Sequence, residues 1–200
     1  MTGAFGLTSQ TGSAAEPVSL DVNARVENDA LLVRYTLVNR RSDAIITFDG
    51  ATGTGGGEYP NMTGQCYISE GSNGLARILR IRPRPHPTAR SRKLFVPAVA
   101  EVKAGETRRV QFRLPFPVKE RSEYSPEFSG ATWDRRAMNR LELRIGWFPR
   151  TASTELKPLG APNVYLLVRG ASIPEMHEVA ATTGVAFDLM VRTDPQFIRM

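Results

Sequence analysis

Two neighbouring runs with an apolar residue at every second position constrain the fold of this chain most strongly. The first run lies between Val18 and Val26, and the second lies between Leu31 and Leu37. A period of two is that of a β-strand with one buried face and one face in water. The dipeptide Asn28-Asp29 separates the runs and suits a two-residue hairpin turn.

A two-residue turn at this position also predicts which residues of the two strands face each other. The expected pairs are Val26 with Leu31, Ala24 with Val33, and Val22 with Tyr35. Both apolar sets then fall on the same side of the hairpin. Because turn chemistry and hydrophobic pattern agree, the sequence favours a true hairpin here.

Further apolar runs between turn sequences predict an all-β protein of eight or nine short strands. Besides the two runs of the hairpin, eight stretches are candidates for these strands: residues 44–49, 64–70, 75–82, 94–102 (interrupted by Pro97), 110–114, 139–148, 164–169 and 185–191. With 200 residues, 41% of them hydrophobic, the chain can form one sizeable core. We expect a flexible polar tail at residues 1–16, followed by a single two-sheet antiparallel sandwich at residues 17–200.

A short helix before the last predicted strand is left open. Ser172 and Glu175 have the spacing of a capping box, Pro174 stands near the helix start, and Gly184 could end the helix. The sequence does not decide between this helix and none.

Two segments resemble parts of bacterial immunoglobulin-like domains. The run from Leu31 to Ile46 resembles their strand, polar loop and strand, and the run from Val102 to Phe112 resembles the turn that leads into a central strand. This resemblance implies an immunoglobulin-like sandwich and brings no catalytic residues with it. Because Cys66 is the only cysteine, the antibody-type core with two cysteines is excluded.

Positive charge is concentrated between residues 77 and 93, where no acidic residue intervenes. This stretch holds seven basic residues. The net charge of the whole chain is +6, but without these seven the chain has 19 basic and 20 acidic residues and is close to neutral. Clustered arginines can bind nucleic acid or an anionic membrane surface. The stretch has no aromatic residue for base stacking, and strand arginines can also protect a sheet edge, so both interpretations stay open. The candidate residues are Arg77, Arg80, Arg82, Arg84, Arg90, Arg92 and Lys93.

A long loop predicted between Lys119 and Met138 combines aromatic rings with charges of both signs. This is the composition of a protein-binding surface, and loops at the ends of a sandwich commonly carry recognition. The alternative is that the rings fold back and cap the core. The candidate residues are Tyr124, Phe128, Trp133, Arg135 and Arg136.

No pattern in the chain predicts catalysis, a metal or another cofactor. One cysteine and two histidines are too few for an ordinary zinc site. The glycine cluster at residues 50–57 lacks the helix and the Lys-Ser/Thr pair of a phosphate-binding loop. His177 lies between two glutamates, and Cys66 has no cationic neighbour in sequence that would lower its pKa.

The sequence therefore predicts a non-catalytic protein-interaction or assembly module. An electrostatic binder of an anionic polymer or membrane surface is the first alternative, and a hydrolase whose site is not visible in sequence is the second. Another protein is the expected partner, and a homo-oligomer is left open. No apolar run approaches the ~20 residues of a membrane span, and the N-terminus lacks a secretory signal, which favours the cytoplasm.

Overall fold

The computed structural model describes residues 16–48, 66–81, 98–121, 130–159, 162–168 and 175–194. These ranges contain strands and connecting segments only, so the described chain has no helix that could cross a membrane. Residues 1–15 of the predicted tail and the whole glycine cluster at residues 50–57 lie outside the described residues.

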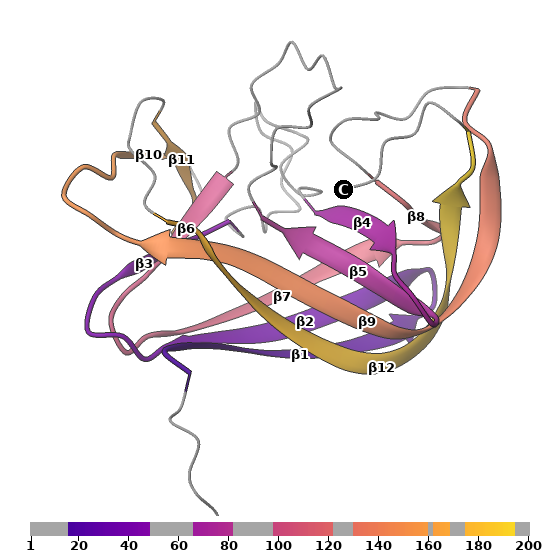
Figure 1. Cartoon of the computed structure of the whole chain (residues 1–200), viewed down its shortest axis with the longest axis horizontal. Coiled ribbons are helices and arrows are strands. Elements are labelled where there is room, and N and C mark those ends of the chain that lie inside the picture. Colours follow the sequence, from indigo (N-terminus) through magenta and orange to yellow (C-terminus); the bar gives the residue numbers. More distant parts are fainter. Residues whose placement is uncertain are drawn as a thin grey trace, which may run out of the picture.

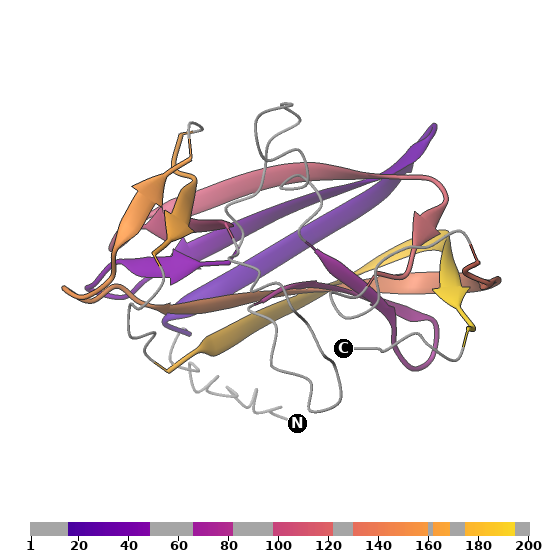
Figure 2. The same cartoon turned by 90° about the horizontal axis from the view of Figure 1, so that it is seen from above.

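The strands form two sheets that lie in separate layers (Figures 1 and 2). The smaller sheet has the order β1 (Val18–Glu27), β2 (Ala30–Asn39) and β7 (Thr107–Pro115). The larger sheet has the order β10-β11-β6-β3-β9-β12-β8, with β5 also paired to β9 and β4 paired to β5. Its strands are β3 (Ile45–Thr47), β4 (Tyr67–Glu70), β5 (Leu75–Arg80), β6 (Ala98–Val102), β8 (Val118–Lys119), β9 (Trp133–Pro149), β10 (Leu156–Pro158), β11 (Tyr165–Leu167) and β12 (His177–Arg192).

The hairpin predicted at Asn28-Asp29 is confirmed in its register. The structure pairs Val26 with Leu31, Ala24 with Val33, and Val22 with Tyr35. Asn28 adopts a positive φ of 40°, which asparagine tolerates better than most residues. The turn expected in the run from Val102 to Phe112 is also present, with a hydrogen bond of 3.1 Å from the Glu106 amide to the Lys103 carbonyl.

Inward side chains of both sheets form the main apolar core, as the alternation predicts. Leu31 and Leu37 of β2 are fully buried, and so are Leu141, Leu143 and Ile145 of β9. A second, smaller cluster forms on the opposite face of β9, because neighbouring residues of a strand point to opposite faces. It contains Ile46, Phe48, Val99, Phe148 and Leu167, with Leu156 and Tyr165 of the β10–β11 hairpin packed against it.

The C-terminal helix that the sequence left open does not form from residue 177 onward, because β12 is one strand from His177 to Arg192. It pairs with β9 along its length and shifts register only between Gly184 and Phe187. The capping-box pattern is a local signal, whereas Val179 is buried and Ala181 and Val185 pack against the core at a period of two. Long-range pairing with β9 therefore decides the conformation.

Two further details differ from the prediction. The sandwich is mostly antiparallel, but β5 pairs in parallel with β9 and β8 pairs in parallel with β12. The segment from Lys119 to Met138 is not a loop throughout, because β8 ends at its beginning and β9 starts at Trp133.

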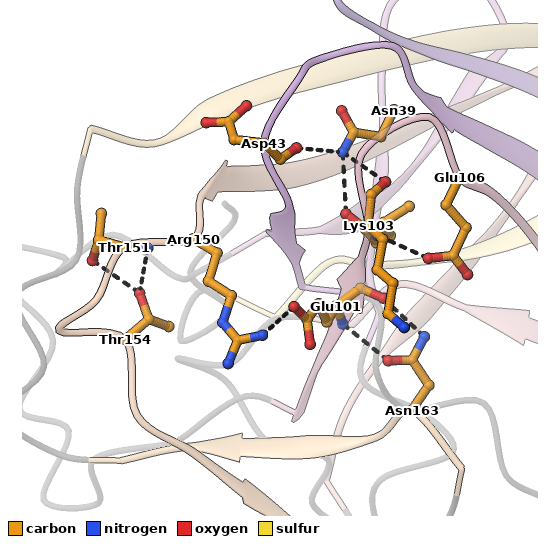
Figure 3. A network of polar contacts seen from close by, with 10 residues as sticks. Asn39, Asp43, Glu101, Lys103, Glu106, Arg150, Thr151, Thr154 and Asn163 are labelled. Atoms are coloured by element: carbon orange, nitrogen blue, oxygen red, sulfur yellow. Dashed lines mark hydrogen bonds and ion pairs between the residues drawn. The ribbon is translucent and has the colours of Figure 1, made fainter.

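A buried asparagine joins the two sheets at one end of β9 (Figure 3). Asn39 is fully buried, and its Nδ2 donates to the carbonyls of Asp43, Val102 and Lys103 at 2.9, 3.1 and 3.0 Å. Its Oδ1 accepts a hydrogen bond of 3.1 Å from the Arg41 amide. The Asn39 side chain thus supplies hydrogen-bond partners for buried backbone groups at the point where β2, β6 and the connection to β3 meet.

Candidate interaction site

Trp133 lies at the first residue of β9, opposite Arg192 near the end of β12. Its ring is half-buried and belongs to none of the apolar clusters of the described residues. The Lys119 Nζ lies 5.2 Å from the ring centroid, and the Arg192 guanidinium carbon lies 5.8 Å from it. Both distances are within the range of cation–π contacts, which therefore hold the ring in place.

Arg192, one of the two cations near this ring, belongs to a buried group of paired charges. The side chain of Arg192 is 1% exposed and donates to both carboxylate oxygens of Asp194, at 2.8 and 3.1 Å. Glu120 is also buried, and its Oε2 accepts a hydrogen bond of 3.0 Å from the Arg192 amide. A buried charge is tolerated when it is paired and hydrogen-bonded, as here. We call Lys119, Glu120, Trp133, Arg192 and Asp194 the Trp133 end.

Arg135 and Arg136 add exposed charges beside the Trp133 end. Arg135 forms an ion pair with Asp188, and its hydrogen bond lowers the pKa of that carboxyl. Arg136 pairs with Asp134 at 3.2 Å. Both arginine side chains are more than half exposed, so a partner could compete for them at little cost. Tyr124 and Phe128, the other two candidates of this segment, lie outside the described residues.

The described part of the basic stretch does not form a free cationic surface. Arg77 and Arg144 share the Glu142 carboxylate, at 3.2 and 2.8 Å, and Arg144 also lies 3.7 Å from Glu178. These four side chains form a chain of alternating charge on β5, β9 and β12. Arg82, Arg84, Arg90, Arg92 and Lys93 lie outside the described residues.

Arg80 faces the core, so its prediction as a surface ligand for anions is wrong. Its side chain is 2% exposed, and its guanidinium carbon lies 4.2 Å from the ring centroid of Phe112. Arg80 also does not protect a sheet edge, because β5 lies between β4 and β9 and is not an edge strand. The signal was present in the sequence: Ala76 and Ile78 mark the inward face of β5, and Arg80 continues it.

The ion pairs of Glu142 with Arg77 and Arg144 predict that the contribution of Glu142 to stability depends on pH. The hydrogen bond from Arg144 lowers the pKa of Glu142 below its ordinary 4.5, and the charge of Arg77 adds to this effect. The contribution is therefore complete above pH 4.5 and is lost as pH falls through the lowered pKa of the folded state. Replacing Glu142 by Gln should lower the free energy of unfolding at pH 7 by about 0.5–1 kcal/mol, since two partners are partly exposed.

Urea unfolding of the wild type and of Glu142→Gln between pH 2 and pH 7 measures this difference. The two proteins should converge at the acidic end, while Asp21→Asn, a control on the exposed face of β1, should stay close to wild type throughout. A deficit of Glu142→Gln that is equal at all pH values would contradict the ion-pair explanation.

The two residues considered for hydrolysis lie in different surroundings. The His177 ring stacks on Trp147, with centroids 4.6 Å apart and planes inclined by 31°. Cys66 is buried in the core, and burial raises the pKa of its thiol, which disfavours the reactive thiolate. The described residues contain no group of three His, Cys, Asp or Glu side chains that could hold a metal ion.

Comparison of the chain with known proteins gave no relatives. No protein-family model matches it, and no curated protein and no solved structure is similar enough to count as a match.

Proposed function

We propose that this protein is a non-catalytic interaction or assembly module that binds another protein through the Trp133 end. The observation that carries this proposal is the half-buried Trp133 ring, in cation–π contact with Lys119 and Arg192. Tryptophan and arginine are enriched among the residues that dominate binding energy at protein interfaces. A ring already fixed in the free protein loses little conformational entropy on binding.

Capping of the core, the competing role for this ring, has less support. The first residue of β9 in the main apolar cluster is Met138, five positions after Trp133, and the ring contacts cations instead. Charges of both signs surround it, on Arg135, Asp188, Arg136 and Asp134. An aromatic centre with a mixed polar rim is the usual composition of a non-obligate protein interface.

We also propose that the sandwich is immunoglobulin-like, because two of its segments resemble parts of such domains. The elements that resemble such domains are β2 with its polar connection to β3, and the turn that leads into β7. The parallel pairs of β5 with β9 and of β8 with β12 are departures from a purely antiparallel arrangement. A solved complex or a close relative of known fold would decide the class.

Electrostatic binding through the basic stretch is the weaker proposal. Of its two described residues, Arg77 is paired with Glu142 and Arg80 is buried. We find no observation in the described residues that favours a hydrolase.

Affinity capture from cells that make this protein tests the Trp133 end. Trp133→Ala should reduce recovery of the partner at least tenfold, because truncating a central aromatic anchor costs about 2 kcal/mol or more of binding free energy. Recovery is quantified by mass spectrometry for the wild type and each variant in parallel.

Two variants serve as controls for this experiment. Trp133→Phe keeps an aromatic ring and should retain part of the binding. Arg25→Ala, at an exposed position of β1 in the smaller sheet, should leave recovery unchanged. If every captured protein is recovered equally with Trp133→Ala and with wild type, the proposed site is wrong.

A further inference from the structure

The outer edge of β7 is a long strand edge that no other strand of the described residues pairs. In the smaller sheet, β2 lies between β1 and β7, so β7 has a neighbour on one side only. The strand runs over nine residues, from Thr107 to Pro115. An unpaired edge of this length is a template to which another strand can add.

The hydrogen bonds that flank the strand show which backbone groups face this edge. The Asn39 amide donates to the Glu106 carbonyl at 3.0 Å, and the Phe116 amide donates to the Asp29 carbonyl at 2.8 Å. Even-numbered residues of β7 therefore bond to β2, because pairing alternates along an antiparallel ladder. The backbone groups that face outward belong to the odd-numbered residues, which are Thr107, Arg109, Gln111 and Arg113, together with the carbonyl of Pro115.

The side chains along this edge divide into an apolar row and a basic row. Val110, Phe112 and Leu114 point into the core but keep 8–9% exposure, whereas their neighbours Leu31 and Val33 on β2 have none. The core is thus less completely covered along β7. On the outer face, Arg109 and Arg113 are both exposed.

Charge argues against a second copy of this chain as the added strand. Antiparallel pairing of two β7 strands about Gln111 would place Arg109 of one copy opposite Arg113 of the other. Like charges directly opposite each other destabilise a strand pair. Arg113 forms an ion pair with Asp29 at 2.8 Å, and both side chains are more than half exposed, so an incoming carboxylate can replace Asp29.

We propose that the outer edge of β7 binds an extended segment of another protein that carries two acidic residues four positions apart. Paired antiparallel, such a segment places one carboxylate opposite Arg109 and the other opposite Arg113. Its alternate residues, if apolar, cover the exposed parts of Val110, Phe112 and Leu114. This site is separate from the Trp133 end, and its test does not depend on the function proposed above.

A synthetic nine-residue peptide is the probe for this edge. Valine alternates in it with threonine or glutamate, and its two glutamates stand four positions apart; a second peptide has lysine in place of glutamate. The acidic peptide should shift the amide resonances of Thr107, Arg109, Gln111 and Arg113 of the full chain and slow their hydrogen exchange. The basic peptide should bind at least tenfold more weakly.

Two variants separate strand addition from general attraction of charge. Arg109→Glu combined with Arg113→Glu should reverse the preference, so that the lysine peptide binds more tightly than the glutamate peptide. Arg25→Glu, on the same outer face but on β1, should keep the wild-type preference. Gln111→Pro removes an outward amide and should abolish binding of the acidic peptide while the melting temperature confirms that the variant is folded.

Several results would overturn the proposal. One is slow exchange of the four amides in the free monomer, which would mean that the chain covers its own edge. A second is concentration-dependent dimerisation that protects the same amides, which would make a second copy the occupant. A third is binding of the acidic peptide that persists in Gln111→Pro, which would indicate charge attraction without strand pairing.

Discussion

Replacing Asn39 by leucine should lower the free energy of unfolding by about 4 kcal/mol, which is a large part of the stability of a domain. The side chain is fully buried and makes four hydrogen bonds with backbone groups of two segments, the connection after β2 and the end of β6. Leucine fills a similar volume but leaves the carbonyls of Val102 and Lys103 and the amide of Arg41 without this partner. Each buried polar group that loses its partner costs about 1–3 kcal/mol.

Urea unfolding at neutral pH measures the effect, and two variants check its cause. Asn39→Asp keeps the acceptor for the Arg41 amide but turns a carboxylate toward three carbonyls, so it should destabilise at least as much as leucine. Asn23→Ala, an exposed asparagine of β1, should change stability by about 0.5 kcal/mol or less. If Asn39→Leu is as stable as wild type, the buried junction does not hold the two sheets together.

Replacing Leu143 by alanine should cost about 3 kcal/mol, because it leaves a cavity between the sheets. Leu143 is fully buried at the middle of β9, with Ile78 of β5 beside it on one side and Ala181 of β12 on the other. Its side chain belongs to the cluster that also contains Leu31 and Val33 of the smaller sheet. The loss therefore reports packing of one sheet against the other.

The matched control for this cavity lies one residue along the same strand, on the other face. Arg144→Ala removes a side chain that is 38% exposed and breaks only ion pairs, so a loss of about 1 kcal/mol or less is expected. Urea unfolding measures both variants. Equal losses of stability would contradict the structure, in which Leu143 lies on the buried face of β9 and Arg144 on the exposed face.

The first hairpin could be predicted in full because its information is local. Turn residues, apolar alternation and register all lie within β1, β2 and the two residues between them. The strand β12 could not, because helix-capping residues near its start are also local, whereas the pairing that overrides them comes from β9, far away in sequence. Parallel pairing of β5 with β9 was missed for the same reason.

The candidate site was only partly predictable. Trp133, Arg135 and Arg136 were found from composition, and the structure places them at one end of the β9–β12 pair. The supporting residues Glu120 and Arg192 were missed, because burial of a charged side chain depends on partners distant in sequence. The strand edge of β7 was missed because a sequence shows a strand but not which of its sides has a neighbour.

In the function proposed here, folding and binding depend on different residues. Asn39 and Leu143 hold the sheets together, whereas Trp133 rests on charges outside the apolar clusters of the described residues. A protein whose recognition residues lie apart from its core can lose binding without losing its fold.

The free energy of unfolding of Trp133→Ala, measured together with its recovery of the captured partner, tests this separation most directly. We predict a stability loss of about 1 kcal/mol, because two cation–π contacts at a half-buried ring are removed, and at least a tenfold decrease in the recovery of the partner. A stability loss of about 3 kcal/mol or more with unchanged recovery would show that the ring caps the core, and would contradict the proposed function.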